Sequence, residues 1–82
     1  MINTVVKVQY QRIRNLREDK DLTQVAIGQA INVPQRTYAY YESGKRTIPP
    51  HVLIALAIFH GTSVDYLLEL TDNPKPYECG HI

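Results

Sequence analysis

The stretch TQVAIGQAINVPQRTYAYYESG, residues 23–44, decides the fold of this 82-residue chain. Thr23 is a preferred residue type at a helix N-cap, and apolar residues follow it at the three-to-four spacing of an amphipathic helix as far as Ile31. Asn32 then interrupts this spacing, and asparagine tolerates the left-handed conformation in which many helices end. Pro34 has no backbone N–H to donate, which suits the start of a new helix.

The second of these helices has two different faces. Tyr38 and Tyr41 share one face, which predicts packing into the core, with base stacking as the alternative. Gly44 is typical of a helix end. Gly28 in the first helix has no side chain, which would let the second helix cross close by. Two short helices joined by a tight turn are typical of a DNA-binding helix-turn-helix unit.

Three further helices are expected, so the fold class is all-α. One runs from about residue 10 to residue 20, one spans 50–60, and a short one, capped by Ser63, continues to Leu70. They would complete a single domain at residues 10–71. An N-terminal extension covers residues 1–9, where a helical start is the alternative to a frayed end, and a C-terminal tail covers residues 72–82.

The charges are unevenly distributed along the chain. Residues 1–46 contain eight Lys or Arg against four Asp or Glu, whereas residues 47–82 contain one against four. A basic half that carries the helix-turn-helix unit suits a polyanionic partner, although short chains also show such imbalance by chance. A single cysteine excludes an internal disulfide, and no apolar run reaches the ~18 residues of a membrane span. We therefore expect a cytoplasmic protein without a secretory signal.

Several motifs together are specific. They are Arg12-Ile13-Arg14 with Arg17, Leu22-Thr23-Gln24, residues 41–46 (YESGKR), residues 63–68 (SVDYLL) and residues 71–74 (TDNP). In these motifs the chain resembles the lambda repressor–Cro type of helix-turn-helix domain, the xenobiotic-response-element family, over about residues 12–74. The resemblance implies a compact five-helix bundle that binds double-stranded DNA as a dimeric transcriptional repressor. The chain departs from the family pattern at Gly28, Asn32 and His60, which stand where the family usually has Ala, Gly and an aromatic or Leu.

The resemblance also implies which side chains read bases. Gln35, Arg36 and Tyr40 match the base-reading positions of the second helix, and Thr37 would lie at the edge of the groove. Glutamine pairs with adenine and arginine with guanine through two hydrogen bonds each. The alternative is that these side chains only face solvent.

Phosphate contacts require donors on both flanks of that helix. The candidates are Gln24, Lys45, Arg46 and Thr47, with Arg14 and Arg12 of the first helix as weaker ones. Each cation has the alternative of an ordinary solvated charge.

Two further groups have assigned roles. The resemblance pairs Arg17 with Glu42 as a partly buried structural ion pair, with a phosphate contact by Arg17 as the alternative. An apolar set would form the dimer interface, or else ordinary core; its members are Ile58, Val64, Leu67 and Leu70.

Catalytic chemistry is not indicated. The histidines and Cys79 lack zinc-ligand spacing, and the segment Cys79-Gly80-His81 is better interpreted as tail than as a metal site. No glycine loop could cradle a phosphate, so we expect no enzyme activity, cofactor or metal. The alternative to a DNA-binding regulator is a protein-interaction module, such as an antitoxin or a mobile-element accessory protein.

Overall fold

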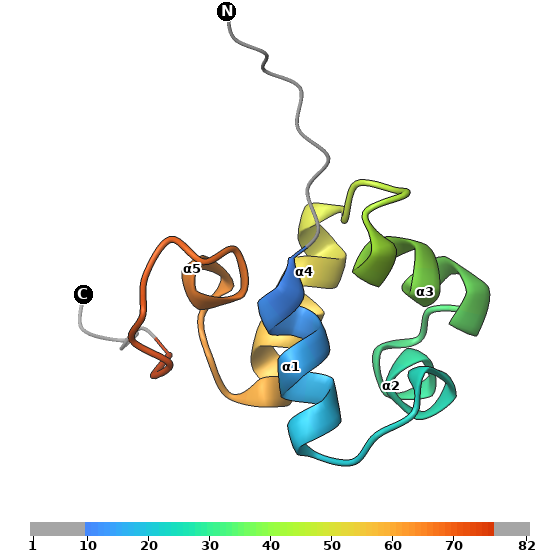
Figure 1. Ribbon diagram of the computed structural model, residues 1–82, viewed down its shortest axis with the longest axis horizontal. Helices are drawn as coiled ribbons and strands as arrows, with labels where there is room; N and C mark the ends of the chain where they lie inside the picture. The colour runs from blue at the N-terminus through green and yellow to red at the C-terminus, as the bar shows by residue number, and fades with distance from the viewer. Residues whose placement is uncertain (1–9, 77–82) are drawn as a thin grey trace, which may run out of the picture.

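The computed structural model describes residues 10–76, which form a bundle of helices (Figure 1). The helices are α1 (Gln11–Asp19), α2 (Gln24–Ile31), α3 (Gln35–Ser43), α4 (Pro50–His60) and α5 (Val64–Leu67). The described part contains no strand, which confirms the all-α prediction. The extension at 1–9 and the tail segment with Cys79 and His81 lie outside the described residues. Within residues 10–76 no helix is long and apolar enough to cross a membrane.

The turn between α2 and α3 is built by local chemistry. The Thr23 hydroxyl accepts a hydrogen bond from the Ala26 N–H at 3.0 Å and so caps α2. Asn32 ends α2 with a φ of 64°, in the left-handed region that the sequence predicted. The Val33 N–H then donates to the Gly28 carbonyl at 2.8 Å. These bonds fold the chain back so that α3 begins directly after Pro34.

Gly28 allows the close approach that the sequence predicted. A Cβ atom on Gly28 would lie 2.6 Å from the Val33 carbonyl oxygen and 3.7 Å from the Gln35 Cα. The turn and the first residue of α3 therefore pack over Gly28, which agrees with the predicted close approach of the two helices, although the tightest neighbour is the turn. A side chain here would push against the turn that sets the direction of α3.

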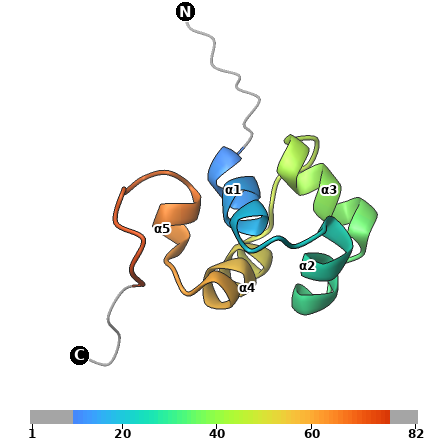
Figure 2. The same cartoon turned by 60° about the horizontal axis from the view of Figure 1, so that its bottom comes forward.

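The core takes one fully buried side chain from each helix. These are Ile13, Ile27, Tyr38, Leu56 and Leu67, in the order α1 to α5. Tyr41 is also buried, which confirms that the two tyrosines of α3 pack inward. Seen from below, α4 lies between α2 and α5 and beneath α1 (Figure 2), in keeping with its apolar sequence.

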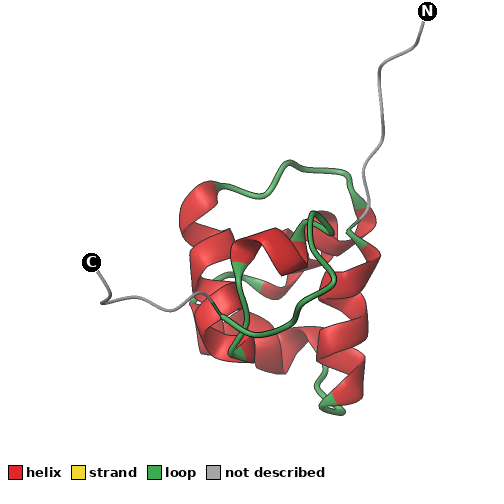
Figure 3. Cartoon of the chain, turned by 90° about the vertical axis from the view of Figure 1, so that its left-hand side faces the viewer, coloured by secondary structure: helices red, strands yellow, loops and turns green. Residues whose placement is uncertain are grey.

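The end of α5 differs from the prediction. The helix stops at Leu67, and Glu69 adopts a φ of 63°. The prediction that it continues to Leu70 is therefore wrong. A left-handed residue ends helical geometry, and the residues that follow form a loop on the α5 side of the bundle (Figure 3).

His60 brings a polar ring into the packed end of α4. Its Nδ1 and Nε2 atoms are buried and find no hydrogen-bond partner among the described residues, and its ring lies edge-on to Phe59 with the centroids 5.0 Å apart. Burial, with a smaller contribution from the charge of Lys20, lowers the pKa of His60 from 6.5 to about 4. The folded protein therefore holds this ring in the neutral form.

We expect the protein to lose stability as the pH falls from 6.5 towards 4. In that range the unfolded state binds a proton at His60 that the folded state does not, so the free energy of unfolding decreases by about 1–3 kcal/mol in all. Urea denaturation at pH 7 and pH 5 measures this loss. In the variant His60→Leu the free energy of unfolding should depend less on pH. The variant His51→Gln changes an exposed position of the same helix and should keep the pH dependence of the unchanged protein. An equal decline in His60→Leu would show that another group titrates.

Candidate nucleic-acid interface

The outward face of α3 carries the side chains predicted to read bases. Gln35 and Arg36 are exposed in the first turn, and Thr37 and Tyr40 are half-buried. Tyr38 faces the core on the other side of the helix. Helix α3 thus packs against the core with one face and exposes the other to solvent. The exposed face begins at the N-terminus of α3, next to the turn from α2 (Figure 1).

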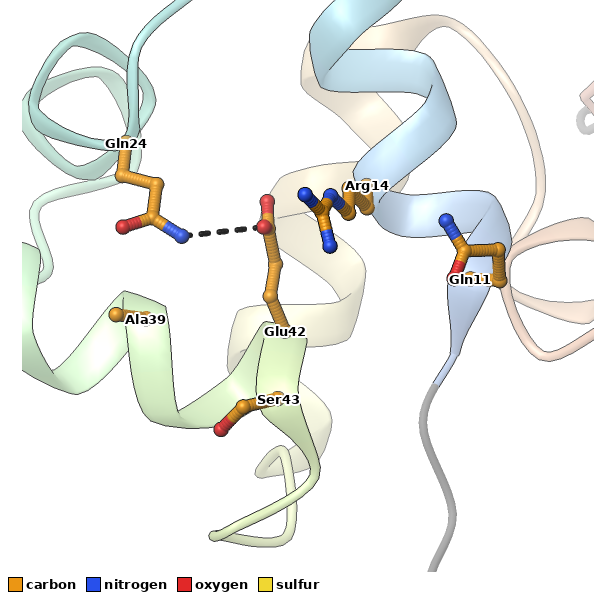
Figure 4. A pocket seen from close by; sticks show the side chains of 6 residues that line it. All are labelled: Gln11, Arg14, Gln24, Ala39, Glu42 and Ser43. Atoms are coloured by element: carbon orange, nitrogen blue, oxygen red, sulfur yellow. Dashed lines mark hydrogen bonds between the residues drawn. The ribbon is translucent and has the colours of Figure 1, made fainter.

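A hydrogen-bonded chain holds the start of α3. The Gln35 side-chain amide donates to the Gln24 Oε1 atom at 3.1 Å, and the Gln24 amide donates to the Glu42 Oε1 atom at 3.2 Å (Figure 4). Gln24 is the first residue of α2, whereas the other two lie at opposite ends of α3. Gln24 therefore uses both ends of its amide group to fix the orientation of Gln35.

Arg17 continues this chain into α1. Its Nε donates to Glu42 Oε2 at 2.6 Å and its Nη2 to Glu42 Oε1 at 3.2 Å, while its Nη1 donates to the Leu22 carbonyl at 2.7 Å. The side chains are only 11% and 4% exposed. Arg17 and Glu42 therefore form the ion pair that the family resemblance implied.

The pKa of Glu42 reflects this arrangement. Burial by itself would raise the pKa, but the hydrogen bonds from Arg17 and Gln24, the nearby Tyr38 hydroxyl and the charge of Arg17 lower it below the usual value on balance. The hydrogen bond to Glu42 raises the pKa of Arg17 in return. Burial also raises the pKa of Tyr38 far above its usual value, so that its hydroxyl stays protonated. The pair is fully charged at neutral pH.

The loop after α3 gathers two cations around one ring. The Lys45 Nζ lies 5.6 Å, and the Arg46 guanidinium 5.1 Å, from the centroid of the Tyr40 ring. The N–H groups of both residues also donate to the Tyr40 carbonyl, at 2.9 and 3.3 Å. Gly44, with a φ of 84°, makes this reversal possible. Lys45, Arg46 and Thr47 are all exposed, so their positions suit contacts with a phosphate backbone.

A polar cavity of about 200 Å³ lies between α1, the start of α2 and α3 (Figure 4). It is lined by Gln11, Arg14, Gln24, Ala39, Glu42 and Ser43. Arg14 is half-exposed at its edge and pairs with Glu18 one turn along α1 at 3.1 Å. The exposed guanidinium and the nearby N-terminus of α2 favour an anion at this edge.

The sequence matches known proteins over this same region. A family model described as helix-turn-helix matches residues 13–67. The chain belongs to the XRE-type helix-turn-helix family. It is also 38% identical, over 66 residues, to the uncharacterized HTH-type transcriptional regulator YobD of Bacillus subtilis (strain 168). The match covers 80% of this chain and 59% of that protein. No solved structure matches the chain.

One arginine of this XRE-type domain has a role that sequence reasoning missed. Arg12, a weak phosphate candidate, donates from Nη1 to the carbonyls of Tyr66 and Thr71, at 3.1 and 2.8 Å. Its guanidinium also lies 4.1 Å from the centroid of the Tyr66 ring. Arg12 therefore ties α1 to the end of α5. No sequence spacing predicts this contact, because the partners lie more than fifty positions away.

The apolar set proposed for a dimer interface divides into surface and core. Ile58 is 76% exposed and Leu70 is 71% exposed, and Val64 is half-buried. Leu67 is fully buried within one chain, which matches the alternative of ordinary core packing and removes it from the candidates for contact with a second copy. Its side chain points into the core because α5 packs on α4 through that residue's face. Ile54, one turn before Ile58, is also exposed.

Potential metal ligands do not cluster in the described part of the chain. Residues 10–76 contain no group of three His, Cys, Asp or Glu side chains arranged to hold an ion.

We expect Glu42→Ala to destabilise the protein strongly. The change would leave Arg17 as an unpaired charge at a mostly buried position, which costs about 3–5 kcal/mol. For a domain of this size the melting temperature should fall by more than about 10 °C. Thermal unfolding followed by circular dichroism measures the shift at pH 7.

The matched control is Glu18→Ala. Glu18 also pairs with an arginine, but its side chain is 49% exposed, so its loss should cost about 0–1 kcal/mol. Small and equal shifts for both variants would contradict a stabilising role for the Arg17–Glu42 pair. A second check is the pH dependence, because the contribution of Glu42 is present above the unfolded pKa of about 4.5 and is lost as the pH falls below it.

Proposed function

We propose that this chain is a sequence-specific DNA-binding transcriptional regulator that represses by binding a two-fold symmetric operator as a dimer. The observation that carries the proposal is the hydrogen-bonded chain from Arg17 through Glu42 and Gln24 to Gln35. It holds the first turn of α3 rigidly while leaving its outer face exposed and polar. The family membership and the regulator YobD support the same function.

In this proposal α3 enters the major groove with its first turn leading. Arg36 is exposed there, and its guanidinium would donate to the O6 and N7 atoms of guanine. Gln35 would pair with adenine while Gln24 holds the other side of its amide in place. Thr37 would meet the edge of the groove. Because Gln35 is already oriented before DNA arrives, less side-chain freedom is lost on binding.

Phosphate contacts would lie on both sides of α3. On one side are Gln24, at the N-terminus of α2, and Arg14, at the edge of the polar cavity. On the other side are Lys45, Arg46 and Thr47, which follow the helix. Such contacts fix the register of the protein on DNA without reading sequence.

A second copy is needed because one α3 helix reads only half of a symmetric site. Two reading helices must lie about 34–36 Å apart to enter successive turns of the groove on one side of the duplex. The surface candidates for the contact between copies are Ile58, Leu70 and Val64, and the structure adds Ile54. Ile54 and Ile58 lie on α4, Val64 on α5 and Leu70 in the loop after it, so none of the four belongs to α3.

One observation favours a second function. Helix α4 is apolar almost all round, yet Ile54 and Ile58 remain exposed on one stripe, as they would on a protein-interaction module. The polar and cationic surface at α3 and the loop after it favours DNA over that alternative. Binding assays with DNA separate the two.

We expect Arg36→Ala and Lys45→Ala to weaken DNA binding in different ways. Arg36→Ala should cost about 1–3 kcal/mol on a duplex selected from a random library, and should relax preference at one base pair. Lys45→Ala should weaken binding to all sequences alike. It should also reduce the slope of log affinity against log salt concentration by about one, because one fewer counterion is released. Titrations on the selected duplex and a scrambled one, over a series of salt concentrations, measure both effects.

Two outcomes of the same titrations would contradict these assignments. An equal loss on both duplexes for Arg36→Ala would make Arg36 a phosphate contact. If the unchanged protein binds neither duplex at low salt, DNA binding is excluded and the protein-interaction function takes its place.

We expect Tyr40 to act through its ring on the two cations beside it. Tyr40→Phe keeps the ring and should preserve the salt dependence of binding, whereas Tyr40→Leu removes the attraction, worth about 0.5–1 kcal/mol at an exposed site, and should lower affinity on all sequences. The measurement is the salt series on the scrambled duplex. If Tyr40→Phe instead loses preference on the selected duplex alone, the hydroxyl reads a base and the ring contacts are incidental.

A further inference from the structure

Tyr38 carries a polar atom that the core leaves unpaired. The residue is fully buried, and its hydroxyl has no hydrogen-bond partner among residues 10–76. A buried hydroxyl without a partner costs free energy that phenylalanine at the same position would not cost. Packing of the ring therefore explains the aromatic side chain but not its hydroxyl.

Glu42 is the acceptor within reach of this hydroxyl. Tyr38 and Glu42 stand four positions apart in α3 and are both buried, so their side chains share one face of the helix. The Tyr38 hydroxyl also helps to lower the pKa of Glu42, as a donor close to a carboxylate does. Because this hydroxyl stays protonated at neutral pH, it remains able to donate.

The Glu42 carboxylate binds its donors with unequal strength. Its Oε2 atom accepts from Arg17 Nε at 2.6 Å, whereas Oε1 accepts from Arg17 Nη2 and from the Gln24 amide at 3.2 Å each. The bond from Gln24 is long for an N–H donor and comes from a neutral group, whereas a hydroxyl binds a carboxylate at about 2.5–2.7 Å. The contact with Gln24 is therefore the one that Glu42 exchanges most easily.

Gln24 has two tasks that compete for its amide nitrogen. In the free protein Nε2 donates to Glu42 across the polar cavity (Figure 4), and Oε1 accepts from Gln35. In the proposed complex Gln24 also donates to a DNA phosphate. A turn of the amide that keeps the contact with Gln35 would bring Nε2 to the phosphate, but it would leave the buried Glu42 carboxylate one donor short.

We propose that Tyr38 is a positioning residue for DNA binding: its hydroxyl donates to Glu42 when the Gln24 amide turns from Glu42 to a phosphate of the duplex. The carboxylate then keeps its number of donors, so the Arg17–Glu42 pair stays in place while Gln24 binds DNA. This inference rests on the proposed function, from which it takes the phosphate contact of Gln24. It requires no second copy of the chain.

Tyr38→Phe tests the proposal because it removes the hydroxyl and keeps the ring. The hydroxyl has no partner in the free protein, so the melting temperature measured by circular dichroism should stay the same or rise. Affinity for DNA should nevertheless fall about tenfold, on the selected and the scrambled duplex alike, because a phosphate contact carries no sequence information. A lower melting temperature or an unchanged affinity would overturn the proposal.

Gln24→Met makes the same exchange occur without DNA. Methionine has a similar length but no N–H, so Glu42 loses the donor that DNA would withdraw, and the Tyr38 hydroxyl should replace it. In this background Tyr38→Phe should lower the melting temperature by about 5 °C or more, and should no longer change the affinity for DNA. Tyr41→Phe is the matched control at the other buried tyrosine of α3, and its effect should be the same in both backgrounds.

Failure of this inference is distinguishable from failure of the proposed function. If the unchanged protein binds neither duplex at low salt, both are overturned. If it binds DNA, but Tyr38→Phe shifts the melting temperature equally with and without Gln24→Met, only the role of Tyr38 is overturned. Should Gln24→Met fail to fold, the affinity of Tyr38→Phe for the two duplexes decides alone.

Discussion

The buried pair of Arg17 and Glu42 is the interaction on which the rest of this domain depends. Removing two charges from water is costly, and their attraction offsets that cost only when the geometry is good and the remaining hydrogen-bonding capacity is used. Here Arg17 donates from three nitrogens, and Glu42 also accepts from Gln24. The pair therefore requires that α1, α2 and α3 be correctly placed at once. Gln24 extends the same network to Gln35, so the packing that places the pair also orients the proposed reading turn.

Local chemistry explains what the sequence could predict. The cap at Thr23, the left-handed Asn32 and the break at Pro34 each depend on residues at most a few positions away, so the sequence alone locates the turn between α2 and α3. The inward faces of Tyr38 and Tyr41 follow from helical spacing in the same way. The end of α5 was not predictable, because the run of leucines suggests a longer helix.

Contacts between distant residues account for what was missed. Arg12 donates hydrogen bonds to carbonyls at the end of α5, more than fifty residues later in the chain. Nothing in the sequence around Arg12 distinguishes it from Arg14, whose side chain is exposed. The exposure of Gln35 and Arg36 could be inferred from the pattern of α3. The sequence could not predict the hydrogen bond that orients Gln35 or the two cations around Tyr40. Each of these contacts depends on how the chain packs in three dimensions.

The apolar sequence of α4 has a physical consequence for assembly. A helix that is apolar all round is stable in water only where neighbours cover it, and α2 and α5 pack against α4 but leave a stripe with Ile54 and Ile58 exposed. Ile54 and Ile58 on that stripe would remain in water in a single copy. Covering them would stabilise an assembly by an amount proportional to the apolar area removed from water, about 25 cal/mol per Å². Because α5 packs on α4, the exposed stripe of α4 keeps a fixed position relative to α5.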